Sequence, residues 1–334
     1  MGGSSVDDGW ELTSPSNGVR TVVLVGRTGN GKSATGNSIT GRKSFISKAS
    51  SNGVTSTCEL QTTILGDGQI VNVIDTPGLF DFSEGYEFSG KEIVKCIHLA
   101  KDGIHAVLLV FSVRARFTHE EAAAIRSLQT LFGSNIIKYM IVVFTGGDDL
   151  EDEDRTLEDY ISSNCPEPLK EILALCENRC VLFDNKTKDK SKRVEQVQQL
   201  FSLVDTVIAQ NGGLPFSNEL FADLKEGAVK LQQMEDDLSK GCSKKEILDL
   251  KNDLQCSYDE QLKRITEMIE MKLKEAITRL EQQLADEQAA RLQAEKEAAK
   301  AREKSEDEIR QLKEHLTKAQ EELCKRPENR CTIL

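Results

Sequence analysis

Residues 26–33 read Gly-Arg-Thr-Gly-Asn-Gly-Lys-Ser and directly follow the apolar run 21–25. This is the GxxxxGK[ST] pattern of a phosphate-binding loop, in the strand, loop and helix context that the pattern requires. Its glycines let backbone N–H groups turn inward around an anion, and the following helix directs its positive end at the same place. The segment therefore predicts a phosphate-binding loop between a strand and a helix.

Within this loop, we expect Lys32 to reach the β- and γ-phosphates of a nucleotide and to support catalysis, and the Ser33 hydroxyl to hold Mg²⁺. A purely structural glycine-rich turn is the alternative, and the flanking strand and helix patterns disfavour it. The residues expected to contact the nucleotide are Gly26, Arg27, Thr28, Gly29, Asn30, Gly31, Lys32, Ser33 and Ala34.

Composition excludes several classes of protein. The 334 residues carry 43 Lys and Arg against 55 Asp and Glu, a net charge of −12, whereas a nucleic-acid-binding protein would present a basic face. Nine cysteines without CxxC or Cys/His spacing indicate neither a disulfide framework nor a zinc site. No stretch resembles a signal peptide or approaches eighteen apolar residues, so we expect a soluble, intracellular, reduced protein.

The chain changes its pattern near residue 210. Residues 1–18 read as a disordered arm, and residues 19–210 alternate short apolar strands with helices, which predicts an α/β domain with a mostly parallel sheet and helices on both faces. The expected strands are 21–25, 59–65, 70–75, 105–111, 138–144 and 179–183, and the expected helices lie near 32–40, 89–101, 118–131, 156–176 and 191–210.

Residues 211–215, Asn-Gly-Gly-Leu-Pro, indicate a loop at a domain boundary, and beyond them the sequence becomes rich in Glu, Lys, Gln, Leu and Ala. We expect a linker and helical segment over 211–257, a coiled coil over 258–325, and a tail over 326–334. A lone solvated helix is the alternative, but apolar stripes favour a partner helix. Residues that step by three and four form two heptad seams, namely Leu273, Ile277, Leu280 and Leu284, then Ile309, Leu312, Leu316, Ala319 and Leu323.

A second motif, Asp75-Thr76-Pro77-Gly78, follows the apolar strand 70–74. Asp75 is placed to contact Mg²⁺, usually through water, and the Gly78 N–H to contact the terminal phosphate. Alone, this motif could be no more than a strand exit. Downstream of a phosphate-binding loop, it indicates a GTPase rather than an ATPase.

The base-reading motif is irregular. GTPases commonly present Asn-Lys-x-Asp after the fifth strand, where the Asp accepts hydrogen bonds from guanine. Here two glycines occupy the Asn-Lys positions, Asp149 takes the guanine-reading position, and Asp148 is the near alternative. Asn185, after the next strand, is placed to lie at the edge of the base. An acidic surface loop is the other interpretation, because six of the seven residues 148–154 are acidic.

Four segments carry a further signal, namely the phosphate loop running into Ala34–Ile39, Val54–Cys58, Asp75–Asp81 and Arg116–Glu121. Together they resemble the immunity-associated nucleotide-binding GTPases (the IAN, GIMAP or AIG-type family), and Phe144–Asp148 looks like the plant members. The resemblance covers roughly residues 18–210 and implies a septin- and Toc-related G domain that binds GTP or GDP with Mg²⁺ and dimerises across its nucleotide face.

The resemblance also implies a hydroxyl in the first switch segment that contacts the nucleotide and Mg²⁺. Ser47, Thr55 and Thr57 are the candidates, and Thr55 is preferred. The additional conserved box of the family falls near residues 107–126, and its arginine matches Arg116.

Leu79 follows Gly78 where Ras-type GTPases place the Gln that orients water. Leucine cannot orient water, so we expect slow intrinsic hydrolysis that needs a charge-stabilising group from elsewhere. Arg116 is the best candidate, because the box arginine acts across the dimer in some members of the family. Arg114 is the second choice, and an ordinary surface arginine is the alternative interpretation.

Cys331-Thr332-Ile333-Leu334 match the C-a-a-X pattern, in which a final Leu favours geranylgeranylation of Cys331. One lipid usually gives only reversible binding, so a second signal is expected, with Cys324 a candidate for palmitoylation. These features predict a cytoplasmic protein attached peripherally to the cytosolic face of a membrane.

The leading interpretation is a membrane-anchored GTPase switch that forms a homodimer or oligomer through its G domain and coiled coil. The alternative is a catalytically weak scaffold, stabilised by nucleotide, that acts through its coiled coil and lipid anchor. Leu79 and the irregular guanine motif favour the scaffold, whereas Lys32, Ser33 and Asp75 favour the switch.

Overall fold

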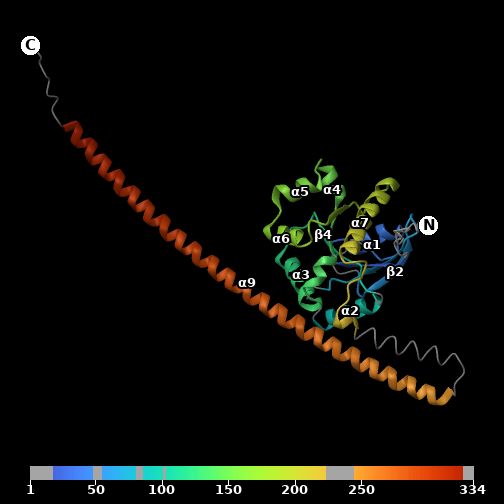
Figure 1. Ribbon diagram of the computed structural model, residues 1–334. Coiled ribbons are helices and arrows are strands. Elements are labelled where there is room, and N and C mark those ends of the chain that lie inside the picture. The colour runs from blue at the N-terminus through green and yellow to red at the C-terminus, as the bar shows by residue number, and fades with distance from the viewer. Residues whose placement is uncertain (1–17, 48–54, 80–85, 101–102, 223–243, 326–334) are drawn as a thin grey trace, which may run out of the picture. The chain divides into compact units, whose positions relative to one another are not determined.

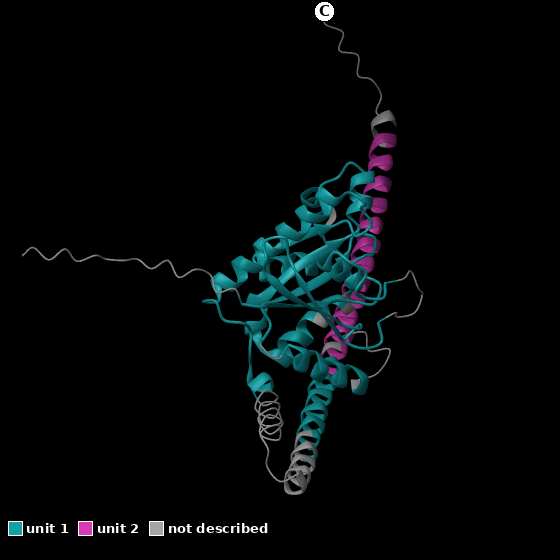
Figure 2. Cartoon of the chain, turned by 90° about the vertical axis from the view of Figure 1, so that its right-hand side faces the viewer, with its two compact units in different colours: residues 1–277 teal, residues 278–334 magenta. Residues whose placement is uncertain are grey.

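The computed structural model describes residues 18–47, 55–79, 86–100, 103–222 and 244–325 (Figure 1). The predictions for the N-terminal arm before residue 18 and for the lipidation site Cys331 lie outside these residues. The chain divides into two compact units, residues 1–277 and 278–334 (Figure 2). Among the described helices, none combines the length and the apolar character that crossing a membrane requires.

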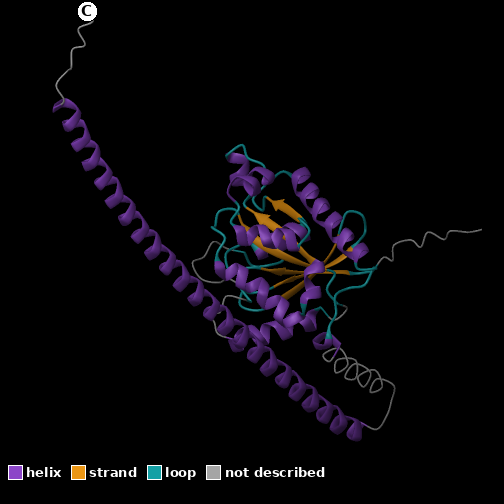
Figure 3. Cartoon of the chain, turned by 60° about the vertical axis from the view of Figure 1, so that its left-hand side comes forward, coloured by secondary structure: helices purple, strands orange, loops and turns teal. Residues whose placement is uncertain are grey.

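Unit 1 is built around a six-stranded sheet in the order β2-β3-β1-β4-β5-β6. Only β2 runs antiparallel to its neighbour, and the other pairs are parallel. Strands β1, β4 and β5 are buried along almost their whole length because helices cover both faces of the sheet (Figure 3). The strands are β1 Arg20–Val25, β2 Glu59–Ile64, β3 Ile70–Asp75, β4 Ala106–Ser112, β5 Met140–Thr145 and β6 Cys180–Phe183. The predicted fold class is confirmed.

Two groups of helices pack on this sheet. Helix α1 contacts β1, β2 and β3 as well as α7, and α7 also contacts β4 and β6. Helix α3 contacts α6 and the 3₁₀ helix η2. The helices of this layer structure are α1 Lys32–Thr40, α2 Tyr86–Leu99, α3 His119–Phe132, η2 Ser134–Tyr139, α6 Glu167–Leu175 and α7 Lys190–Gln210.

The helix predicted over 156–176 is wrong as a single element. The structure has α5 over Leu157–Asn164 and α6 over Glu167–Leu175, separated at Pro166. Proline has no N–H and forces the preceding residue out of the helical region, so it ends one helix and begins the next. The acidic segment after β5 also contains a short helix, α4 (Gly147–Asp152), that the sequence did not predict.

The buried core continues past Gln210. Phe216 forms an isolated bridge with Ile104 and packs edge-on against Tyr139 at a centroid distance of 5.4 Å. Phe132 and Phe221 complete the aromatic cluster around it. The segment that follows α7 therefore closes the amino-terminal edge of the sheet, beside the start of β4.

Helix α9 (Lys244–Lys325) begins in unit 1 and continues into unit 2. Its apolar residues Ile265, Ile269 and Leu273 recur every fourth position, and all three belong to the core of unit 1. A Cβ added at Gly90 of α2 would lie 2.9 Å from the Glu270 side chain, so α2 and α9 pack closely here. The start of the first predicted heptad seam is thus covered by unit 1 itself.

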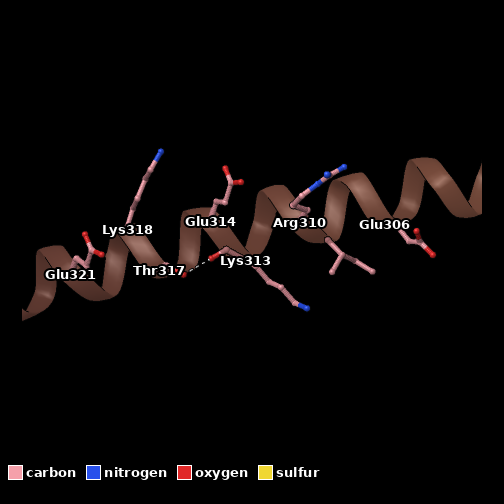
Figure 4. A pocket seen from close by; sticks show the side chains of 8 residues that line it. Glu306, Arg310, Lys313, Glu314, Thr317, Lys318 and Glu321 are labelled. Carbon is pink, nitrogen blue, oxygen red and sulfur yellow. Dashed lines mark hydrogen bonds between the residues drawn. The ribbon is translucent and has the colours of Figure 1, made fainter.

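Within the described residues, unit 2 consists of the remainder of α9, and large apolar side chains along it are exposed. Leu312 and Leu316 of the second predicted seam are 68% and 61% exposed. A shallow hollow beside Ile309 is lined by side chains that all come from this one helix and point away from its axis (Figure 4). Within the described residues of unit 2, no second element covers this surface.

Candidate nucleotide-binding site

The phosphate-binding loop lies at the carboxyl end of the central strand. β1 pairs in parallel with β3 on one side, where Leu24 is opposite Asp75, and with β4 on the other. Because parallel strands end at the same edge of a sheet, the loop after β1, the Asp75 motif and the loop after β4 all meet there. This edge is where open α/β sheets bind their ligands.

Two glycines of the loop are required by its geometry. A Cβ added at Gly26 would lie 2.4 Å from the Val110 carbonyl oxygen, closer than any side-chain carbon can approach. Gly31 caps the N-terminus of α1 with φ of 94°, a left-handed conformation that glycine adopts without strain. The loop can therefore turn tightly enough to present its N–H groups to an anion.

Lys32 lies inside the curve of this loop. It is largely buried, and its Nζ donates hydrogen bonds to the carbonyl oxygens of Gly26 at 2.8 Å and Arg27 at 3.1 Å. The ammonium is therefore held at the mouth of the loop, where phosphate oxygens would bind.

Ser33, Thr55 and Asp75 form a cluster of oxygen atoms beside the loop. Ser33 Oγ donates to Asp75 Oδ2 at 2.5 Å, and the Ser33 and Thr55 hydroxyl oxygens lie 2.9 Å apart. Burial raises the pKa of Asp75, while the Ser33 hydrogen bond and the Lys32 charge act to lower it. Three segments far apart in the sequence thus bring their oxygens to one place.

The residues present fit Mg²⁺. Asp75 Oδ1 is buried and has no hydrogen-bond partner among the described residues, which leaves an acceptor for a metal-bound water. Mg²⁺ takes oxygen ligands and usually keeps several waters, binding through few protein groups together with the substrate phosphates. Hydroxyls at Ser33 and Thr55 with one carboxylate provide such a set, and the ligands would be completed by phosphate.

The three candidates for the first switch hydroxyl lie in different surroundings. Thr55 joins Ser33 and Asp75, as the preferred choice requires. Thr57 instead donates to the Glu92 carboxylate on α2 at 3.0 Å, and Ser47 is exposed. Of the three, Thr55 is therefore the residue that the structure brings to the oxygen cluster.

The residues after Asp75 end the strand and enter the core. Gly78 is partly buried just beyond the end of β3. Leu79 is 4% exposed and belongs to the hydrophobic core. A side chain at this position packs inside the protein, so it does not reach the phosphate site as a water-orienting glutamine would.

The proposed base-reading residues lie on α4. Asp149 accepts hydrogen bonds from Arg114 Nε and, at 3.0 Å, from Arg114 Nη2. Asp148 accepts from Arg114 Nη2 at 2.6 Å and from Lys186 Nζ at 2.7 Å. Partial burial acts to raise the pKa of Asp148, but these cationic neighbours outweigh it, and the pKa is lowered. Arg114, the second choice as a catalytic arginine, is thus committed to this acidic pair.

Asn185 lies at the start of the loop after β6, next to the start of α4. Its amide donates to Thr35 Oγ1 at 3.1 Å and accepts from Ser38 Oγ at 2.7 Å, so both ends of the amide are used by α1. A Cβ added at Gly147 would lie 3.1 Å from the Asp184 backbone nitrogen, which shows how closely the two loops approach. Asn185 therefore holds the β6–α7 loop against α1 and beside α4.

Arg116 lies on the turn between β4 and α3. Its side chain is exposed and makes no ion pair with any described residue. The turn itself is well anchored, because Thr118 and Glu121 form a capping box at the start of α3. An exposed arginine on an anchored turn is available to a second molecule.

Asn30 has a role that the sequence did not reveal. Its side chain donates to the Val110 carbonyl at 3.0 Å and to Glu121 Oε1 at 2.8 Å, and its own carbonyl accepts from Thr145 Oγ1 at 2.7 Å. It therefore ties the phosphate-binding loop to β4, β5 and α3. The Thr118-x-x-Glu121 capping pattern was visible in the sequence, but its link to Asn30 was not.

Comparisons with known proteins bear on the family of the chain. The model of the AIG1 family matches residues 20–236. Immune-associated nucleotide-binding protein 9 of Arabidopsis thaliana is 59% identical over 324 residues, covering 96% of this chain and 94% of the relative. Immune-associated nucleotide-binding protein 8 of the same plant is 51% identical over 250 residues, 75% of this chain and 71% of the relative.

Among solved structures, Toc33 from Arabidopsis thaliana in complex with Mg²⁺ and GMPPNP is similar with a TM-score of 0.45 and 20% identity, over 56% of this chain and 85% of that chain. The family model spans well over half of the residues, and the relatives at 59% and 51% identity cover most of the chain. The family predicted from the sequence motifs is confirmed: the chain belongs to the AIG1 family.

Proposed function

We propose that this AIG1-family GTPase binds GTP and GDP with Mg²⁺ and acts as a switch whose hydrolysis is slow in the monomer and stimulated by a second copy. The observation that carries the proposal is the meeting of Lys32, Ser33 and Asp75 at the carboxyl edge of the parallel strands. A buried cation, a hydroxyl and a buried carboxylate around an anion-binding loop suit the phosphates of a nucleoside di- or triphosphate with Mg²⁺.

Each residue has a defined task in this proposal. Lys32 would exchange its carbonyl partners for β- and γ-phosphate oxygens, and the Gly78 N–H would contact the terminal phosphate. Ser33 and Thr55 would hold Mg²⁺ directly, and Asp75 through water. Mg²⁺ held by these residues would supply positive charge that offsets the negative charge developing on the phosphate.

The site lacks a group of its own that would orient water or stabilise the transferred phosphoryl group during GTP hydrolysis. Leu79 is buried, and Arg114 is paired with Asp148 and Asp149, so neither is free to orient water or stabilise the transferred phosphoryl group. Arg116 is exposed on an anchored turn at the same edge of the sheet. An arginine supplied by a second molecule raises GTPase rates by about 10³–10⁵ in other systems. We infer that Arg116 has this role.

The test is GTP turnover per site, measured under single-turnover conditions across a range of protein concentrations. Wild type should accelerate by about tenfold or more as the protein dimerises, while Arg116→Ala should stay at the low rate with its GDP affinity retained. Arg126→Ala removes another exposed arginine, from α3, and should behave as wild type. A wild-type rate that is independent of concentration contradicts stimulation in trans.

A catalytically weak scaffold is the second candidate, and the burial of Leu79 favours it. In a scaffold, bound nucleotide would stabilise unit 1, and the protein would act through its coiled coil and lipid anchor. Lys32→Ala separates the two functions, since it should abolish a switch but leave a scaffold able to assemble. Thermal unfolding with and without GDP reports the nucleotide contribution in both cases.

We further propose that the protein self-associates through the exposed seam of unit 2 and attaches to the cytosolic face of a membrane through a prenylated Cys331. The seam is supported by the exposed side chains of Leu312 and Leu316. Cys331→Ser in cells should abolish sedimentation with membranes, and Cys324→Ser should weaken it if a second lipid contributes. Unchanged sedimentation of Cys331→Ser excludes this anchor.

A further inference from the structure

We propose that Arg114 competes with guanine for Asp149 and thereby lowers the affinity of the site for guanine nucleotides. The inference rests on the proposed function, because it assumes that Asp149 reads the guanine base. It assigns to Arg114 a part in base recognition and removes it from phosphoryl chemistry.

The ion pair between Arg114 and Asp149 uses both oxygens of the carboxylate. Arg114 Nε donates to Asp149 Oδ2, and Nη2 donates to Oδ1 at 3.0 Å. Guanine offers the same pattern, two parallel N–H donors, from its N1 and its exocyclic amine. A carboxylate accepts only one pair of parallel N–H donors across its two oxygens. Guanine and Arg114 therefore cannot both bind Asp149 in this geometry.

The backbone of Arg114 is held by hydrogen bonds of its two neighbours, whereas its side chain is partly exposed. The Val113 N–H donates to the Thr145 carbonyl at 3.0 Å, and the Ala115 N–H donates to the Ser112 carbonyl at 3.2 Å. The guanidinium, by contrast, reaches into a region where the Arg114 side chain is 44% exposed and that of Asp149 is 39% exposed. Exchange of partners therefore needs only rotation of one side chain.

The packing around Gly146 places Arg114 next to the loop between β5 and α4, the helix that carries Asp149. A Cβ added at Gly146 would lie 2.8 Å from Val113 Cγ2 and 3.2 Å from Asp149 Oδ2, with Arg114 Cγ at 3.7 Å. The turn after β4 and the loop after β5 are therefore in direct contact at the point where Arg114 leaves the backbone. A bulkier residue than glycine would separate the two partners.

Asp148 explains where the guanidinium goes when guanine binds. Arg114 Nη2 already reaches Asp148 Oδ2 at 2.6 Å, so Arg114 can release Asp149 without losing every ionic partner. Lys186 holds the same Asp148 oxygen at 2.7 Å and keeps that carboxylate in position. The two adjacent acids thus have separate tasks: Asp149 binds the base, and Asp148 retains the displaced arginine.

The partial exposure of the Arg114 and Asp149 side chains determines how strongly their ion pair affects nucleotide affinity. Ion pairs between partly exposed side chains are weak, and displacing one reduces affinity by about two- to fivefold. Arg114 would therefore adjust the nucleotide affinity without preventing binding.

The experiment measures binding of a fluorescent GDP analogue and of inorganic pyrophosphate, the latter by competition, to the full chain with Mg²⁺. Arg114→Ala should bind GDP about two- to fivefold more tightly while its affinity for pyrophosphate does not rise. Arg126→Ala, which removes the same charge from α3, should match wild type for both ligands. Arg114→Gln keeps a polar but shorter and uncharged side chain and should shift in the same direction as Arg114→Ala.

Unchanged or weaker GDP binding in both Arg114 variants overturns the competition, and so does an equal gain for pyrophosphate, which would indicate a general charge effect. Failure of wild type to bind GDP at all would instead refute the proposed function. In the Asp149→Asn background, Arg114→Ala should no longer strengthen GDP binding, because the shared carboxylate is gone. A gain that persists there also overturns the proposal.

Discussion

The Asn30 side-chain amide donates a 2.8 Å hydrogen bond to the carboxylate of Glu121, which lies 91 residues later in the chain. Asn30 is 4% exposed and Glu121 is 6% exposed, so the bond is sheltered from water. The other oxygen of Glu121 accepts the Thr118 N–H at 3.0 Å. One carboxylate therefore joins the phosphate-binding loop to the first turn of α3, next to the turn that carries Arg116.

Glu121→Ala should lower the free energy of unfolding by about 1–3 kcal/mol, because it removes a helix cap and leaves a buried amide with one partner fewer. Glu121→Gln keeps an acceptor for one of the two N–H groups and should lose less. Urea unfolding of both variants checks this. Glu158→Ala, in the exposed first turn of α5, should change stability by less than about 0.5 kcal/mol. Losses in both the Ala and the Gln variant that are no larger than the loss in Glu158→Ala would mean that the carboxylate hydrogen bonds do not contribute to stability.

Asp149→Asn should shift the preference of the site from GDP towards xanthosine diphosphate. An amide at this position donates one hydrogen bond and accepts one, which matches the N1–H and O2 of xanthine and opposes the two donors of guanine. The loss of GDP affinity should be about tenfold or more, since hydrogen bonds to charged groups are worth about 1.5–3 kcal/mol. Titration with both diphosphates checks it. A shift in Asp148→Asn instead would make Asp148 the base-reading residue.

Lys186→Met should reduce stability at neutral pH by about 0.2–1 kcal/mol, the value of an exposed ion pair. The pKa of Asp148 is lowered from its ordinary value of 3.8, so its pairing stabilises the folded chain above that pH and is lost as pH falls through the lowered pKa. The difference between variant and wild type should thus be constant from pH 7 to about 5 and shrink below pH 4. Urea midpoints across this range measure it, with Lys188→Met as the exposed control. A difference that grows on acidification contradicts the assignment.

The parts of this site that follow from local sequence were predictable, and the parts that depend on distant side chains were not. Lys32, Ser33 and Asp75 were recognised because motif and strand order place them at one edge of the sheet. The pairing of Arg114 with Asp149 depends on how two loops fold against each other, and no periodicity encodes it. Pro166 did carry a local signal for a helix break, which the continuous apolar pattern on both sides obscured.

Leu79→Gln should not convert this site into a Ras-like one. Leu79 is in the core, so an amide there would be buried without a designed partner, at a cost of about 1–3 kcal/mol. We expect a lower melting temperature and no faster single-turnover hydrolysis at low protein concentration. Leu79→Met, similar in volume and apolar, should cost less than about 1.5 kcal/mol. Faster hydrolysis by the glutamine variant would show that this position reaches the phosphate site.

Leu316→Glu should weaken self-association of the full chain. Leu312 and Leu316 are exposed on α9, and a long helix gains little from an apolar stripe unless a partner covers it. A charge placed in the seam of a coiled coil must be desolvated against the partner helix, so the dimer should dissociate at concentrations where wild type is associated. Thr317→Glu introduces the same charge one residue away from the seam and should leave association intact. Sedimentation equilibrium on the three proteins decides the matter: if both variants associate as wild type does, unit 2 is not an assembly surface, and if both dissociate, charge alone explains the loss.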